Sequence, residues 1–304
     1  MYRNLANPHS PNRRNRMTNH VAIMMPNGYF ANGAPWREAH LRELTGEDQV
    51  FLMEECHGLL PAQWVTEALS RCVTRLGPNQ PTREAIRSLS VGDREALLLH
   101  LRRLTSGDRL DCVISCPSPD CREKLEIELD VDNLLVSTDG ETRQEHELGI
   151  HREDGAPVVV RFRLPTGSDQ EAVAHLARTD VGAAADMMLR RCVQSVNEDG
   201  ATVNELPAAL REQLPGRMAE LDAQAEINLL VECAVCGGAF SVVFDTAGYL
   251  IQELEAGMRR LYREVHLLAY HYHWSAREIL SMSARKRRRF LQLLEEELTQ
   301  EAVQ

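Results

Sequence analysis

Apolar and polar residues alternate along several short stretches in the middle and the later part of the chain. The alternation is clearest at residues 124–131, 158–164, 227–231 and 240–244. Successive side chains of a strand point to opposite faces, so this pattern is typical of a strand with one buried face. The first, third and fourth stretches flank pairs of cysteines, which predicts that each cysteine pair lies at the tip of a β-hairpin.

Helical spacing of apolar residues dominates the region before these strands. Between residues 36 and 106, helix-starting residues precede apolar residues that recur every three or four positions. Thr45 with Asp48, Thr82 and Asp93 are the residues that we expect to begin helices there. The pattern predicts a small helical unit.

A second helical region lies between the two cysteine pairs. Ser168 and Glu171 form a capping-box pair that should open a helix, and two or three helices are expected over residues 168–221. The sequence Asn-Glu-Asp-Gly at 197–200 interrupts them. We interpret the region as an insertion between the two predicted hairpins.

The chain is predicted to be helical from residue 247 to its end. An apolar stripe there has spacings of three and four residues, close to a heptad pattern. The stripe has two interpretations: it packs on the protein's own core, or it binds a partner. In the second interpretation the contact residues are Leu254, Met258, Leu261 and Val265.

These patterns predict an α+β fold with a small antiparallel, zinc-ribbon-like core, a helical insertion and a C-terminal helical hairpin or bundle. We find no internal repeat in the sequence. The expected organisation is a disordered arm at 1–20, a mainly helical unit at 21–106, a β core at 107–164 plus 222–246, a helical insertion at 165–221, and C-terminal helices at 247–304.

Composition narrows the classes of function. The chain has 304 residues, 43% of them hydrophobic, and a formal net charge of −11. No apolar run approaches the roughly 20 residues that a membrane helix needs, and the polar N-terminus lacks a secretory signal. We therefore expect a cytoplasmic protein without a membrane contact. The negative charge argues against nucleic acid as the main partner.

Four of the eight cysteines carry the clearest chemical signal. They form two pairs, Cys116 with Cys121 and Cys233 with Cys236. Four thiolates at two hairpin tips suit a structural Zn²⁺ site, which is tetrahedral and leaves no open position for catalysis. Cys112 could replace one ligand, but its place on a strand makes it the poorer choice. We expect the other three cysteines to lie in the core: Cys56, Cys72 and Cys192.

Catalytic motifs are not evident. The sequence has no phosphate-binding loop, no dinucleotide-binding glycine motif, no nucleophile elbow and no zinc-protease motif. His266, His271 and His273 are the best candidates for chemistry, but only the first and last would share a helix face. We interpret them as packing residues, and we predict neither an enzyme nor a small-molecule substrate.

A basic run opens the last predicted helix. Arg285, Arg287, Arg288 and Arg289 precede the acidic residues 295–297, an order that opposes the helix dipole. A run of charged residues usually forms a solvent-exposed face of its helix. The alternatives are a docking surface for an acidic partner and, less favoured, a contact with DNA.

Four stretches resemble a known family. They are PNGYFANGAPWREAHLRELTGEDQ, LSVGDREALLLHLRRLTSGDRLDCVISCPSPDC, VECAVCGGAF and LYREVHLLAYHYHWSAREILSMSARKRRRFLQLLEEEL, which together span about residues 22–298. In these the chain resembles the T4-type baseplate hub assembly chaperones of contractile-tailed phages and contractile injection systems. The four-residue gap between Cys116 and Cys121 is wider than the resemblance leads us to expect.

The resemblance implies a non-enzymatic assembly chaperone whose partners are hub or spike proteins of a contractile tail. It transfers no catalytic residue. Two alternatives stay open from the sequence: a permanent structural subunit of the baseplate, and a zinc-ribbon regulator that binds nucleic acid through the basic run.

Overall fold

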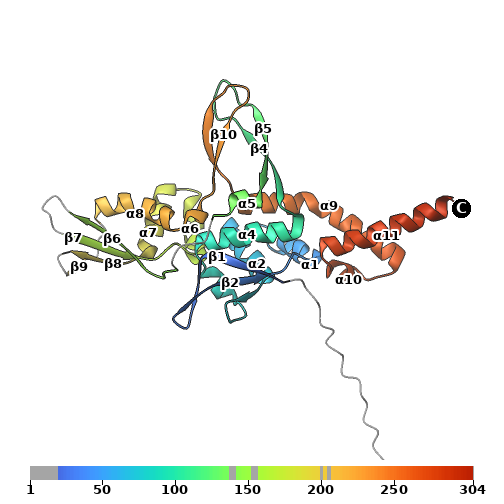
Figure 1. The fold of residues 1–304 in the computed structure, drawn as a ribbon, viewed down its shortest axis with the longest axis horizontal. Helices are drawn as coiled ribbons and strands as arrows, with labels where there is room; N and C mark the ends of the chain where they lie inside the picture. Colours follow the sequence, from blue (N-terminus) through green and yellow to red (C-terminus); the bar gives the residue numbers. More distant parts are fainter. Residues whose placement is uncertain (1–19, 137–141, 152–156, 199–200, 204–206, 304) are drawn as a thin grey trace, which may run out of the picture.

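A computed structural model of the chain describes residues 20–136, 142–151, 157–198, 201–203 and 207–303. The fold is α+β, as predicted, with small antiparallel sheets, many helices and a helical C-terminus (Figure 1). The arm expected at 1–20 lies outside the described residues except for residue 20. Within the described part of the chain, we find no helix whose length and apolar character would let it span a membrane.

The N-terminal region begins with a three-stranded antiparallel sheet. Its strands are β1 (Val21–Ala31), β2 (Ala34–Leu41) and β3 (Val73–Leu76), with β2 in the middle. The mainly helical unit expected at 21–106 thus also contains a sheet, and the strands β2 and β3 fall largely within residues 36–106, where the sequence indicated helices. Only Ala39 and Leu41 of β2 are buried apolar residues, so the strand is too polar to give a clear alternating pattern.

Helices cover this sheet and complete the first core. Thr45 and Asp48 form the predicted capping box, and Thr82 caps its helix as expected. Ser90, rather than Asp93, caps the long helix that follows, because Asp93 lies at the third helical position. The helices are α1 (Gly46–Val50), the π-helix η1 (Phe51–Glu55), α2 (Pro61–Cys72), α3 (Arg83–Arg87) and α4 (Val91–Ser106).

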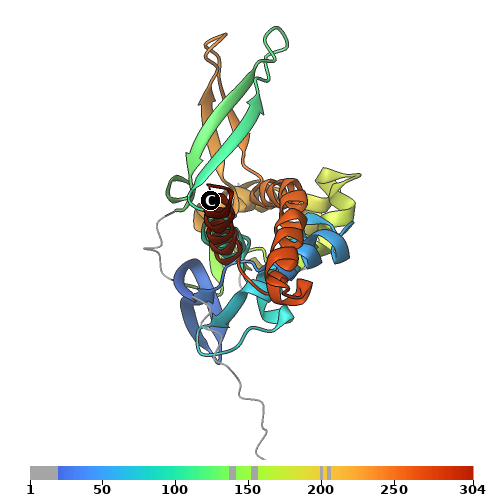
Figure 2. The same ribbon diagram turned by 90° about the vertical axis from the view of Figure 1, so that its right-hand side faces the viewer.

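The two predicted hairpins are present and lie side by side. Each forms its own two-stranded antiparallel sheet, and both project away from the body of the protein (Figures 1 and 2). We call them together the hairpin pair. Their strands are β4 (Arg109–Ser115) with β5 (Lys124–Asp130), and β10 (Asn228–Glu232) with β11 (Ala239–Val243).

A second core surrounds a four-stranded sheet that the sequence did not predict as a unit. Val160 and Phe162 pack there against Leu210 and Leu214. Two strands expected in the zinc-ribbon core join a β-hairpin from the expected helical insertion. The strands are β6 (His146–His151), β7 (Pro157–Phe162), β8 (Val193–Glu198) and β9 (Ala201–Val203), in that order.

Three helices form in the region where two or three were expected. The first begins at Thr166 with Asp169 as the capping box, not at Ser168 with Glu171. They are α6 (Gly167–Ala177), α7 (Val181–Cys192) and α8 (Ala208–Leu221), with the shorter α5 (Val131–Leu134) before them and the 3-10 helix η2 (Ala223–Ala225) after them.

The C-terminal region is helical, as predicted. A 27-residue helix, α9 (Thr246–Tyr272), starts on the first core, and Ser275 with Glu278 forms the capping box of α10 (Ala276–Leu280). The last helix is α11 (Ala284–Val303), which lies beside α9, runs in the same direction and then extends beyond the body (Figure 1).

The structure reveals an internal repeat that our reading of the sequence missed. The first copy runs from β1 to β5, and the second from β6 to β11. In each copy, an antiparallel sheet leads into a Thr-Gly segment, Thr45–Gly46 or Thr166–Gly167, followed by helices, a return strand, further helical segments and a hairpin. The pairing of the middle strand with the return strand shifts register next to Leu41 in the first copy and next to Phe162 in the second.

A polar cluster joins the two copies. Asn27 of β1 donates from its side chain to Ser90 and Asp222, at 3.0 and 2.6 Å, and from its backbone to Asp93 at 2.8 Å. Asp222 also accepts a hydrogen bond from the backbone of Gly92. Asp93 is fully buried, and this burial raises its pKa to about 7, with the nearby Asp222 carboxyl acting in the same direction.

Candidate metal centre

Each hairpin turns tightly around its cysteine pair. In the second hairpin, the backbone of Gly237 donates to the Cys233 carbonyl at 2.8 Å, and the backbone of Cys233 donates to Gly238 at 2.9 Å. Gly237 has a φ of +69°, a left-handed conformation that glycine adopts without steric cost. This local curl directs both sulfurs to the same side of the turn.

The first hairpin has four residues between its cysteines, where the second has two, and it forms an equivalent turn. The backbone groups of Cys121 and Arg122 both donate to the Ser118 carbonyl, and Cys116 donates to Glu123 at 2.8 Å. Arg122 absorbs the extra length in a left-handed conformation, with φ +50°. Four intervening residues therefore do not keep Cys116 and Cys121 apart.

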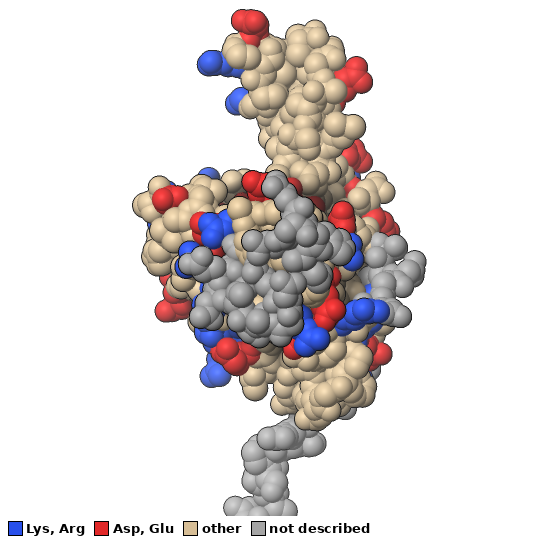
Figure 3. Space-filling view, turned by 90° about the vertical axis from the view of Figure 1, so that its left-hand side faces the viewer, with Lys and Arg blue, Asp and Glu red and all other residues tan. Residues whose placement is uncertain are grey.

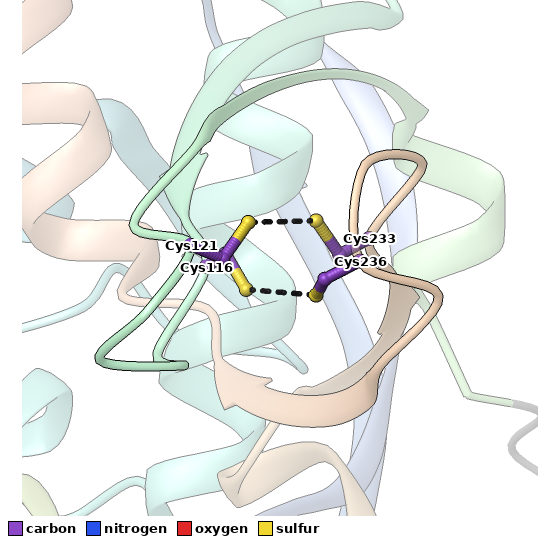
Figure 4. Close-up of side chains that lie close together, drawn as sticks. All are labelled: Cys116, Cys121, Cys233 and Cys236. Carbon is purple, nitrogen blue, oxygen red and sulfur yellow. Dashed lines mark hydrogen bonds between the residues drawn. The ribbon is translucent and has the colours of Figure 1, made fainter.

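The four predicted cysteines meet between the hairpins (Figure 4). Cys116 Sγ lies 3.7 Å from Cys236 Sγ, and Cys121 Sγ lies 3.7 Å from Cys233 Sγ. All four sulfurs lie within 4.8 Å of one another. Thiolates at about 2.3 Å from a tetrahedral ion are about 3.8 Å apart. The sulfurs are thus spaced as ligands and are too distant for disulfides, which need about 2.05 Å.

The electrostatics of the cluster favour the loss of protons to a cation. Backbone N–H groups of Cys236 and Val235 donate to the Cys233 sulfur and lower its pKa to about 7. For Cys116, a hydrogen bond from the Ser118 backbone is outweighed by desolvation and by the other three sulfurs, which raise its pKa to about 12. One thiol thus ionises readily, and its negative charge opposes ionisation of the next until a cation binds.

The remaining cysteines lie elsewhere. Cys56, Cys72 and Cys192 are buried in the cores, as predicted. Burial raises the pKa of Cys72 and of Cys192 to about 12, so both are inert thiols. Cys112 packs against the apolar cluster at the base of the hairpin pair and is not among the four grouped sulfurs. The alternative ligand left open by the sequence is therefore not supported.

The histidines do not form a metal centre in the described part of the chain. His266 stacks on Tyr270, with ring centroids 6.5 Å apart, and His271 meets the edge of the same ring. His273 ends α9 in a left-handed conformation. These contacts match the packing role expected for the histidines.

The outer surface of the hairpin pair carries both charged and apolar residues. On the first hairpin, Arg109 forms an ion pair with Glu128. Exposed apolar residues occur on both hairpins: Val113 on the first, and Leu230 and Val243 on the second. Seen in profile, most of the visible surface of the hairpin pair carries neither acidic nor basic side chains (Figure 3).

The predicted partner-binding residues of α9 are only partly accessible. Leu254 and Leu261 are buried, and Met258 and Val265 are half-buried. The buried residues fit the other interpretation of the stripe, packing on the protein's own core. They are therefore not available on the surface as contact residues.

The arginines of the basic run are likewise divided between exposed and buried positions. Arg285, Arg288 and Arg289 are exposed, whereas Arg287 is only 2% exposed. Arg287 donates from Nε to Glu264 at 2.8 Å and from Nη1 to the Met282 carbonyl at 2.7 Å. The expectation that Arg287 faces a partner is thus corrected: it holds α11 on α9.

Sequence reasoning missed the Thr-Gly segments as a recurring feature. A signal was present: Arg42–Asp48 reads RELTGED and Arg163–Asp169 reads RLPTGSD, and Arg-Cys-Val follows each, at 71–73 and at 191–193. Because the matching stretches are short and far apart, the sequence alone does not make the repeat evident. It becomes evident when equivalent elements of the two copies are compared in the structure.

Most of the two copies lies within a region that matches a known protein family. The sequence model of a family described as "T4 bacteriophage base plate protein" matches residues 35–250. The matched residues run from β2 of the first copy through both hairpins to the start of α9. No curated protein and no solved structure matches the chain.

Proposed function

Because the chain belongs to the T4 bacteriophage base plate protein family, we propose that it is a non-enzymatic assembly chaperone for the baseplate hub of a contractile tail or a related injection system. Its partners in this proposal are hub or spike proteins. The observation that carries the proposal is the four-sulfur cluster, which joins one hairpin from each copy into a single projecting unit.

We propose Zn²⁺ as the ion held by Cys116, Cys121, Cys233 and Cys236. Four thiolate ligands with tetrahedral spacing favour this metal. When bound, it supplies a structural crosslink and, with four protein ligands, has no open position for a substrate. Such an ion contributes on the order of 10 kcal/mol to folding. It would fasten together segments more than 100 residues apart, since Cys116 and Cys236 are separated by 120 positions.

Partner recognition would use the accessible parts of the C-terminal helices. Met258 and Val265 offer partly exposed apolar surface on α9, and Arg285, Arg288 and Arg289 offer positive charge on α11. In a chain with a net charge of −11, a local positive surface favours an acidic partner and raises the rate of encounter.

Deletion of the gene, followed by electron microscopy and infectivity or injection assays, tests the proposal. We expect particles without a correctly assembled baseplate hub. Normal, active particles after deletion would contradict an assembly role.

The alternative is a permanent structural subunit of the baseplate, and mass spectrometry of purified mature particles separates the two. An assembly chaperone should be absent from the particles, whereas a structural subunit should be present in stoichiometric amounts. The hub proteins in the same sample are the internal standard.

A further inference from the structure

Each Thr-Gly segment receives the start of a helix from outside its own copy. In the second copy, Thr166 forms a β-bridge with Ser90 of the first copy. Gly167 donates to the Leu89 carbonyl at 3.1 Å, and Val91 donates to the Pro165 carbonyl at 3.0 Å. This contact connects the N-terminal end of α4 to the second copy.

In the first copy, the same place is filled by the C-terminal region. Thr45 forms a β-bridge with Ser283, and Gly46 donates to the Met282 carbonyl at 3.1 Å. The incoming residues again immediately precede a long helix, here α11. The two Thr-Gly segments are therefore equivalent receiving sites with different occupants.

The two occupants share a sequence signature. We call residues 82–101 the internal docking segment and residues 275–294 the C-terminal docking segment. Each begins with a capping Thr or Ser, has a fully buried Ile four residues later, a bridging Ser after eight residues and a buried Arg after twelve. The matched pairs are Thr82 and Ser275, Ile86 and Ile279, Ser90 and Ser283, and Arg94 and Arg287.

The buried arginine explains why both receiving sites use glycine. A Cβ at Gly167 would lie 2.1 Å from Arg94 Nη1, and a Cβ at Gly46 would lie 3.0 Å from Arg287 Nη1. A side chain at Gly167 would overlap Arg94, and one at Gly46 would force Leu280 and Arg287 to shift, since Leu280 Cδ2 would lie 2.9 Å from the added atom. The receiving site is thus shaped for a helix start that carries an arginine at this position.

The C-terminal docking segment contributes less to the hydrophobic cores than the internal one does. Leu97, Leu98 and Leu101 of the internal segment belong to the first core. Ile279 and Leu294, the buried apolar residues of the C-terminal segment, belong to none of the described core clusters. The C-terminal segment also lies beyond residues 35–250, which match the family. Elements with few core contacts open at low free-energy cost.

We propose that Thr45–Gly46 is a docking site for a helix start of this signature on another chain, which takes the place of the C-terminal docking segment. That the other chain is a baseplate protein rests on the proposed function; the docking itself does not. The resident segment occupies the site until the partner displaces it.

The environment of Glu264 specifies the chemistry of the partner. Glu264 is buried and accepts a hydrogen bond from Arg287, while Arg260 lies 3.9 Å away and is mainly exposed. Removing Arg287 leaves a buried carboxylate without its close partner, which is strongly unfavourable. A replacing helix must therefore bring its own arginine to this position.

A peptide exchange experiment on the full-length protein tests the inference. The probe is a fluorescently labelled synthetic peptide of residues 275–294, and the chain variant Arg287→Ala weakens the resident segment. We expect the peptide to bind this variant about tenfold more tightly than the wild-type chain, because the site is open more often. The same peptide carrying Arg287→Ala should not bind, and Gly46→Val in the chain should abolish binding.

Hydrogen exchange on the wild-type protein provides a second measurement that needs no variant. Backbone amides of α10 and the start of α11 should exchange faster than those of α4. Equal exchange, or failure of the peptide to bind the folded Arg287→Ala chain, would overturn the inference. Either result leaves the particle-assembly tests of the proposed function unaffected, so the two failures are distinguishable.

Discussion

Arg42 and Arg163 occupy equivalent positions in the two copies of the repeat, and each holds the same kind of buried aspartate. Arg42 donates two hydrogen bonds to Asp48, at 2.5 and 3.2 Å, and Arg163 donates two to Asp169, at 2.5 and 3.0 Å. In both copies the arginine also bonds to the carbonyl of a second arginine, Arg71 on α2 or Arg191 on α7, 2.7 and 3.0 Å away.

The second arginine completes the network in each copy. Arg71 donates to Asp48 at 2.9 Å, and Arg191 donates to Asp169 at 2.8 Å. Bidentate arginine–carboxylate pairs of this kind fix geometry as well as contributing energy. The network therefore fixes the Thr-Gly segment relative to its sheet, and it does so twice.

Stability at low pH should depend on Asp169. Burial raises the pKa of this carboxyl, but hydrogen bonds from Arg163 and Thr166 outweigh the burial and lower the pKa to about 2. A carboxyl with a lowered folded-state pKa stabilises the protein above its unfolded-state pKa of about 4, and this stabilisation is lost as the pH falls towards 2.

Urea unfolding of the wild type and of Asp169→Asn at pH 6 and pH 3 checks this. We expect the variant to be less stable at pH 6 by about 3 kcal/mol, because Arg163 and Arg191 both lose their fully buried partner. The difference should shrink at pH 3. A constant difference at both pH values would contradict the assignment.

The stability that Asp93 contributes should change with pH in the opposite direction to that of Asp169. Its pKa is raised to about 7 in the folded protein, chiefly by burial. The folded state therefore favours the protonated form, and this contribution to stability is lost as the pH rises from about 4 through 7. Oδ2 of Asp93 has no hydrogen-bond partner, whereas Oδ1 accepts from the backbone of Asn27 and Gly28.

Asp93→Asn keeps the accepting oxygen and removes the charge. We expect the variant to be more stable than the wild type at pH 8, with the advantage declining towards pH 5. Chemical denaturation at the two pH values measures it, and Asp132→Asn, at an exposed position, is the matched control. An unchanged or lower stability at pH 8 would count against a buried charge at Asp93.

The two receiving glycines should tolerate alanine differently. Gly167→Ala places a methyl group 2.1 Å from an atom of the buried Arg94 and should cost about 3 kcal/mol. Gly46→Ala, with contacts of 2.9 to 3.0 Å to Leu280 and Arg287, should cost about 1 kcal/mol, since the displaced segment is peripheral. Thermal unfolding of both variants checks the order, and Gly216→Ala, with nothing near the added atom, is the control.

Loss of the exposed arginines of α11 should weaken partner binding without affecting the fold. Replacing Arg285, Arg288 and Arg289 together with Ala should reduce co-purification with hub proteins and its sensitivity to salt. The control replaces three arginines exposed elsewhere with Ala: Arg178, Arg190 and Arg211. Equal loss in both triple variants would show that the position of the charge does not matter.

Much of the candidate site was predictable because it depends on local pattern. Alternation at residues 124–131 and 227–231 and the cysteines beside them predicted both hairpins and the meeting of four sulfurs. The spacing of helix-starting residues likewise predicted the start of α1 at Thr45 and Asp48.

The parts that were not predicted depend on contacts distant in sequence. β2 carries Trp36, Arg37, Glu38 and His40, so only its neighbours in the sheet make it a strand. The strand β8 follows a helix that ends at Cys192, and its partner β7 is some 30 residues earlier. Arg287 looks like a surface residue in a basic run until α9 brings Glu264 against it.

The metal content of the purified, reduced protein tests the central claim most directly. Elemental analysis by mass spectrometry should find one zinc ion per chain in the wild type and in Cys112→Ser, and none in Cys233→Ser. A wild-type protein that is folded and fully reduced yet binds no zinc would contradict the account, as would a Cys112→Ser variant that loses the metal.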